Sequence, residues 1–182
     1  MKRIIPLLLA VALIFTGCGS AISNFKNLYG DAYTLFEKTI LEMFQAIQNE
    51  DKEALKKLFS PNVRDNESFD NMVDALFDFI QGDVISYHID NAPGASKAVL
   101  PQVTTRSAYG PISIKTSSNT YYLEVKECLI DTSDKNNEGI CSVYIIDAKN
   151  WQTRFTYRGD GLWTDGIHIE TGNEPHHKDV LE

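Results

Sequence analysis

The sequence has few cysteines, and its basic residues are outnumbered by its acidic ones. Only three of its 182 residues are cysteine, which excludes a disulfide-dense scaffold and leaves a hydrophobic core as the source of stability. It contains 17 Lys and Arg against 25 Asp and Glu, for a net charge of −8. Such an acidic chain lacks the basic surface that nucleic acid requires, so no nucleic acid partner is expected. The length suits one ordinary domain with a short appendage.

The sequence also lacks an apolar run long enough for a membrane span near its N-terminus. The uncharged stretch from Ile4 to Phe15 follows Lys2 and Arg3. A helix of this length covers about 18 Å, well short of a bilayer core of roughly 30 Å. A positive start followed by a short apolar run therefore predicts a cleavable export signal over residues 1–17.

Small residues precede a cysteine at the end of this segment, in the order Phe15-Thr16-Gly17-Cys18. The pattern resembles the lipobox of bacterial lipoproteins, in which the cysteine receives a diacylglyceryl group and becomes the new N-terminus. The resemblance implies lipid attachment at Cys18, with acyl chains such as palmitate, and a cell-membrane location on the extracytoplasmic face. Residues 18–33 would then form a lipidated tether. An ordinary secretory signal with an incidental cysteine is the alternative.

Helical periodicity dominates the first half of the remaining chain. Apolar residues recur at spacings of three and four over residues 34–48, which predicts a helix with one buried face. Asp51 is expected to cap a second, shorter helix that ends at about residue 60. A third helix is predicted over residues 67–81, followed by Gly82 where a left-handed helix terminus favours glycine.

An acidic stripe runs along the third predicted helix, because Asp70, Asp74 and Asp78 recur every four residues. Like charges at this spacing oppose each other by a few tenths of a kcal/mol. The stripe either docks a basic partner or a loosely held cation, or it is a solvated face that the lysines of the preceding helix balance. The solvated face is the favoured interpretation.

Beyond Gly82 the apolar period changes to two, which predicts strands. Helices first and strands later predict an α+β fold, in which helices cover one face of an antiparallel sheet. Residues 91–101 are expected to form a loop. The expected strands cover residues 85–89, 103–114, 121–126, 140–146, 151–157 and 166–170.

Several of these features together resemble a known family. They are the lipobox, the helix ends at Gln48-Asn49-Glu50-Asp51 and Phe79-Ile80-Gln81-Gly82, and the hairpin ending at Gly139-Ile140. The chain resembles uncharacterised lipoproteins, mostly from Gram-positive bacteria, whose domain is nuclear-transport-factor-2-like (cystatin-like). The resemblance covers about residues 34–147 of a domain expected over 34–170, which leaves a polar tail over 171–182.

This resemblance implies a curved sheet that wraps a long helix into a cone. The mouth of the cone is an active site in SnoaL-type enzymes and a ligand-binding or protein-docking site in non-enzymatic members. Fold alone does not choose between these functions. The favoured expectation is a non-enzymatic module of the cell envelope, which binds an apolar small molecule or another envelope protein.

Residues suited to acid–base chemistry are sparse. His168 and Glu170 share one face of the last predicted strand, and His88 lies on the first. Together with a carboxylate in the cone mouth, a histidine could transfer protons. A SnoaL-like isomerase or hydrolase of a small molecule is therefore the alternative function. The sequence has no phosphate-binding glycine loop and no metal-ligand spacing, so neither a cofactor nor a metal is expected.

Cys128 and Cys141 flank a polar turn in two strands that are expected to be neighbours. An oxidising compartment permits a disulfide between them. A one-residue change of register would place the two sulfur atoms on opposite faces of the sheet. The sequence leaves both a cross-strand disulfide and two free thiols open.

Overall fold

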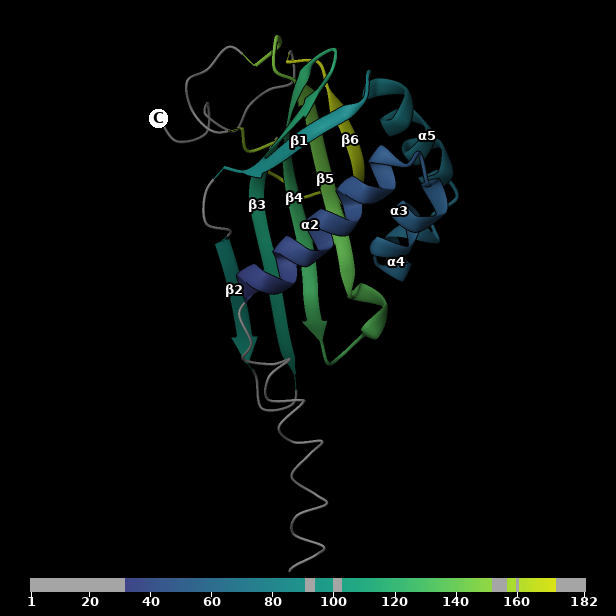
Figure 1. Cartoon of the computed structure of the whole chain (residues 1–182). Helices are drawn as coiled ribbons and strands as arrows, with labels where there is room; N and C mark the ends of the chain where they lie inside the picture. The colour runs from purple at the N-terminus through teal and green to yellow at the C-terminus, as the bar shows by residue number, and fades with distance from the viewer. Residues whose placement is uncertain (1–31, 91–93, 100–102, 152–156, 160, 173–182) are drawn as a thin grey trace, which may run out of the picture. The chain divides into compact units, whose positions relative to one another are not determined.

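The computed structural model describes residues 32–90, 94–99, 103–151, 157–159 and 161–172. Within these residues helices come first and strands follow, which makes the fold a mixed α+β fold (Figure 1). The predicted export signal and Cys18 lie outside the described residues. None of the helices in the described ranges is long and apolar enough to cross a membrane. The elements are α2 (Ala32–Gln48), α3 (Lys52–Leu58), α4 (Pro61–Arg64), α5 (Phe69–Phe79), β1 (Val84–Ile89), β2 (Gly94–Val99), β3 (Thr104–Thr116), β4 (Thr120–Asp131), the 3-10 turn η1 (Lys135–Asn137), β5 (Gly139–Asp147) and β6 (Gly166–Glu170).

The long helix α2 lies diagonally across the sheet and contacts β1, β3 and β4 (Figure 1). Its buried side chains recur at helical spacing, as the sequence predicts. They pack against the inward-facing residues of the strands, so α2 and the inner face of the sheet share one core. The buried core residues of α2 are Phe36, Ile40, Met43, Phe44, Ala46 and Ile47.

Two local features position the shorter helices. The Asp51 carboxylate accepts a hydrogen bond from the Ala54 backbone N–H at 2.8 Å, which confirms Asp51 as the N-cap of α3. The Tyr121 hydroxyl on β4 accepts a hydrogen bond from Gln81 N at 2.8 Å and donates one to Phe79 O at 3.1 Å. The end of α5 is therefore fixed to the start of β4, the central strand of the sheet.

Lysines of α3 balance the acidic stripe of α5. Lys52 Nζ lies 2.6 Å from Asp74, and Lys56 Nζ lies 2.8 Å from Asp70. Both pairs lie at the protein surface, although Lys56 is half-buried, and such surface pairs contribute at most about 1 kcal/mol each. These contacts support the interpretation of the stripe as a solvated face.

The sheet has the strand order β1-β3-β4-β5-β6, and β2 pairs with the other half of the edge of β3. Two features differ from the prediction. Residues 94–99 form the edge strand β2 rather than part of a loop. The last strand, β6, pairs with β5 in parallel, whereas the other pairs are antiparallel. The strand predicted over residues 151–157 lies mostly outside the described residues.

The two faces of the sheet have different coverings. The inner face contacts the helices through apolar residues such as Ile112, Leu123 and Ile145. On the outer face, Tyr144, Ile146 and Tyr157 form a second, smaller cluster. Alternate residues of β5 therefore serve two different cores, because successive side chains of a strand point to opposite faces.

Candidate functional site

The C-terminus of α2 holds an acidic residue in an unusual backbone conformation. Asp51 N donates to Ala46 O at 2.8 Å and Glu50 N donates to Ile47 O at 3.1 Å, the two hydrogen bonds of a Schellman motif. Glu50 occupies the left-handed position of this motif, with φ at 53°. Glycine is the usual residue there, because a side chain makes this conformation unfavourable. The chain thus keeps a carboxylate where backbone energy favours glycine.

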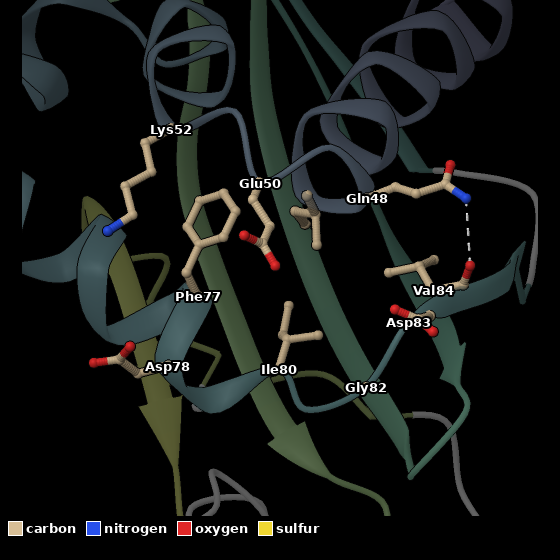
Figure 2. A pocket seen from close by; sticks show the side chains of 10 residues that line it. Gln48, Glu50, Lys52, Phe77, Asp78, Ile80, Gly82, Asp83 and Val84 are labelled. Carbon is tan, nitrogen blue, oxygen red and sulfur yellow. Dashed lines mark hydrogen bonds between the residues drawn. The ribbon is translucent and has the colours of Figure 1, made fainter.

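Glu50 lies at a pocket of about 300 Å³ between the ends of α2 and α5 and the start of β1 (Figure 2). In Figure 2 the Glu50 carboxylate lies between the side chains of Phe77 and Ile80. The apolar residues of the lining are Ile47, Phe77, Ile80 and Val84. The Gln48 amide donates to Val84 O at 3.4 Å and joins the two walls.

The charges around this pocket favour a cation. Glu50, Asp78 and Asp83 all contribute carboxylates, whereas Lys52 contributes the single ammonium group of the lining. Lys52 is already paired with Asp74, and this hydrogen bond, together with the nearby Asp78 and Glu50 carboxylates, raises the pKa of Lys52. The pocket therefore has a net negative charge above an apolar floor. Its described lining contains no histidine and no cysteine, so it offers a place to bind rather than a nucleophile.

The outer face of the sheet holds a buried carboxyl group at Glu124, on β4. Both side-chain oxygens of Glu124 are buried, and neither has a hydrogen-bond partner among the residues that the structure describes. The guanidinium group of Arg158 approaches this carboxyl group, with Nη1 3.7 Å from Glu124 Oε1. Burial raises the pKa of Glu124 to about 8, although Arg158 opposes the rise. Glu124 is therefore mostly neutral at pH 7.

A second buried carboxyl group, Glu127, lies three residues along β4 on the inner face. The Thr39 hydroxyl of α2 donates to Glu127 Oε1 at 2.8 Å, whereas Oε2 is buried and has no partner within the described ranges of the chain. Burial raises the pKa of Glu127 to about 7, the Thr39 hydrogen bond lowers it, and the nearby Glu42 raises it. Neither glutamate was predicted from the sequence as a candidate site residue.

The histidine and carboxylate candidates from the sequence lie away from the pocket of Figure 2. His88 is an exposed residue of β1, opposite Ser113. The His168 ring stacks on Tyr144 with centroids 4.5 Å apart, and its Nε2 lies 2.9 Å from Thr164 O. The buried Glu170 accepts a hydrogen bond from the Tyr157 hydroxyl. His168 and Glu170 share a face of β6, as predicted, and that face is the outer one.

Cys128 and Cys141 are free thiols in the structure. Cys128 lies opposite Gly139, and Cys141 is the unpaired residue of a β-bulge, between the pairs formed by Lys126 and Glu127. Burial raises the pKa of Cys128 to about 11 and also raises the pKa of Cys141. Both sulfurs are therefore expected to be unreactive thiols in the folded protein at neutral pH.

This expectation can be measured on a Cys18→Ala chain, in which the two thiols are the only ones. We expect slow labelling by iodoacetamide at pH 7 in the native state and rapid labelling of both residues after unfolding without reductant. The reason is that only the thiolate reacts and the fold disfavours it. Intact mass spectrometry counts the labels. An unlabelled unfolded protein, lighter by two hydrogen atoms, would instead show that the disulfide had formed.

Two comparisons with known proteins place the chain. It is 28% identical over 136 residues to the phosphoethanolamine transferase EptA of Helicobacter pylori (strain ATCC 700392 / 26695), a match that covers 72% of this chain and 26% of that protein. The chain thus spans about a quarter of that relative. Residues 42–148 match the model of a family described as a domain of unknown function, DUF5104. This match covers the Figure 2 pocket and both buried glutamates of β4. Because it includes more than half of the sequence, the chain belongs to the DUF5104 family.

Proposed function

We propose that this protein is a lipid-anchored binding module of the cell envelope, held on the extracytoplasmic face of the membrane through Cys18. Its ligand is a small molecule with an apolar body and a cationic group, and it binds in the pocket of Figure 2. The proposal treats the domain as a nuclear-transport-factor-2-like cone, with α2 as the enclosed helix. The sequence Thr16-Gly17-Cys18 and the placement of α2 across a sheet support these two parts.

The single observation that carries the ligand proposal is the conformation of Glu50. A left-handed non-glycine residue costs on the order of 1 kcal/mol, and such strain clusters at functional sites. Here the strained residue directs a carboxylate into a pocket with an apolar floor. An ammonium group near Glu50 would be attracted by its carboxylate, while its alkyl part would contact Phe77 and Ile80 (Figure 2).

The replacement Glu50→Gly separates stability from binding. We expect it to raise the free energy of unfolding by about 1 kcal/mol, because glycine adopts the left-handed conformation freely. We also expect it to weaken the binding of hexylammonium by roughly fivefold to tenfold, since one carboxylate is worth about 1 kcal/mol at this exposure. Denaturant titration and isothermal calorimetry measure the two effects.

Two further variants complete the experiment. Glu50→Gln removes the charge but keeps the side chain, so it should weaken binding like glycine without the gain in stability. Glu37→Gln removes an exposed charge of α2 that lies outside the pocket, and it should change neither quantity. The proposal fails if hexylammonium does not bind the wild type at millimolar concentration, or if the glycine variant binds it equally well.

The alternative function, a SnoaL-like isomerase or hydrolase, has one supporting observation. Glu127 lies on the inner face with a pKa of about 7, a value suited to a general base at neutral pH. The two described histidines, His88 and His168, alternate along their strands with inward-facing neighbours such as Tyr87 and Ile167, so neither joins Glu127. The binding module is therefore the preferred proposal.

A further inference from the structure

The two described cysteines lie on the neighbouring strands β4 and β5, close to the turn that joins them (Figure 1). Cys128 follows the inward-facing Glu127, so its side chain points to the outer face of the sheet. Cys141 is the extra residue of the β-bulge on β5, and its sulfur accepts a hydrogen bond from the backbone N–H of Cys128. The bulge therefore turns Cys141 towards Cys128 and makes the two thiols neighbours.

Both thiols use their protons in weak contacts with the backbone of their own strands. Cys128 Sγ donates to Ile130 O at 3.5 Å, and Cys141 Sγ donates to Gly139 O at 3.5 Å. Because S–H groups are weak donors, these contacts stabilise the protonated form only slightly. A metal ion that replaces both protons would therefore disrupt little of the surrounding structure.

The number of available ligands limits the kind of metal ion. Among the residues that the structure describes, no group of three or more His, Cys, Asp or Glu side chains is placed to hold a metal. Structural zinc takes four ligands and calcium takes six to eight oxygen ligands, so two thiols alone suit neither ion. Thiolate sulfur is a soft ligand that selects Cu(I), and a pair of thiolates is sufficient to bind this ion.

The surroundings of Cys141 contain groups that can stabilise such a complex. Two thiolates and one Cu(I) ion together carry an excess negative charge. Burial raises the pKa of Cys141 and the Asp165 and Glu127 carboxylates raise it further, whereas the Cys128 N–H and the Lys126 ammonium group lower it. This N–H and this ammonium group would also stabilise the negative complex. Cys141 is only half-buried, so an ion can reach it from solvent.

We infer that Cys128 and Cys141 together form a binding site for a soft monovalent metal ion, Cu(I). One ion binds both sulfur atoms, two thiol protons pass to solvent, and no electron is transferred. Slow alkylation of the thiols is compatible with this site, because a coordinating metal ion displaces the thiol proton outright. The described lining of the Figure 2 pocket contains neither cysteine, so the metal site is independent of the proposed function.

Cu(I) titration of the reduced Cys18→Ala chain under nitrogen tests this inference, with bicinchoninate as the competing chromophoric chelator. We expect one ion per chain and the release of two protons. Cys128→Ser and Cys141→Ser should each weaken binding by at least about a hundredfold, because loss of a ligand exceeds loss of an outer-shell partner. Lys126→Gln should weaken it by roughly tenfold. Lys149→Gln removes an exposed lysine and should change nothing.

Urea titration shows whether each variant is folded, and the remaining outcomes are distinct. If either single-cysteine variant binds Cu(I) as tightly as the parent chain, the thiols act separately and the paired site is wrong. If the parent does not compete with the chelator, the site does not exist. If the reduced chain becomes lighter by two hydrogen atoms and holds no copper, the sulfurs have formed a disulfide and the inference is overturned. Hexylammonium binding tests the proposed function separately.

Discussion

Replacing Glu124 by Gln is expected to make the folded protein more stable at pH 8 and to leave its stability unchanged near pH 4. Both oxygens of Glu124 are buried without a hydrogen bond from any described residue, and Arg158 approaches to 3.7 Å. A charge at this position has lost its water without gaining a sufficient partner. Glutamine has the shape of the neutral carboxyl group and never acquires the charge.

The pH dependence follows from the raised pKa of Glu124. In the unfolded chain the group ionises near pH 4.5, whereas in the folded protein it ionises near pH 8. The folded state therefore holds the proton more tightly, and the stability contributed by Glu124 is fully present below pH 4.5. It decreases as the pH rises towards 8. Over this window the wild type should lose on the order of 4 kcal/mol that the Gln variant keeps.

Urea titrations of both proteins between pH 4 and pH 9 measure this difference. Glu127→Gln is an informative comparison, because the Thr39 hydroxyl can still donate a hydrogen bond to the amide oxygen. The pH range over which ionisation of Glu127 lowers the stability of the wild type ends near pH 7 rather than pH 8. Glu53→Gln changes an exposed residue of α3, so its free energy of unfolding should depend on pH in the same way as that of the wild type. If the free energy of unfolding of Glu124→Gln depends on pH in the same way as that of the wild type, a buried charge at Glu124 does not destabilise the folded protein.

The helices could be predicted because their signals are local. The apolar spacing along α2 and α5, the Asp51 cap and the glycine at position 82 all act within a few residues of the chain. The structure adds the short helix α4, which begins at Pro61. A proline that ends one helix can also begin another, because its fixed φ suits the first helical turn.

The two differences in the sheet arise from pairing that no local pattern records. The segment Gly94–Val99 is made of small and exposed residues without alternation, and it is a strand because its backbone pairs with β3. The direction of β6 is set by the route of the chain after β5. That route brings Gly166 beside Ser142, so β6 runs parallel to β5. Apolar alternation predicts a strand but does not specify its direction.

The candidate site was harder to predict than the fold. Glu50 looks like an ordinary surface acid in the sequence, and only the Schellman geometry shows that glycine would be preferred there. Glu124 belongs to the polar side of an alternating strand, which predicts exposure. It is buried because residues far along the chain, Arg158 and Gly159, lie against the outer face beside Tyr144. The sequence of one strand does not show which distant residues will cover the second face of the sheet.

The largest change in behaviour is expected from Cys18→Ala. Residue 18 lies before α2, the first described helix, so its replacement should leave the free energy of unfolding unchanged. Membrane partition should change completely, because the two acyl chains proposed at Cys18 would bury many methylene groups at about 0.8 kcal/mol each. We expect the wild type in the detergent phase of Triton X-114, with a lipid-modified N-terminal mass at Cys18. The alanine variant should enter the aqueous phase or persist as an unprocessed precursor.

A second cysteine replacement makes this test specific to the lipid. Cys141→Ser removes a thiol within the sheet but leaves Cys18 intact, so this variant should still enter the detergent phase. If loss of any cysteine disturbed folding, both variants would leave the detergent phase. If only the lipid anchor matters, Cys18→Ala alone should leave it. If the wild type itself is aqueous and cleaved at another residue, Cys18 carries no lipid. The protein is then freely secreted, and its binding pocket works away from the membrane.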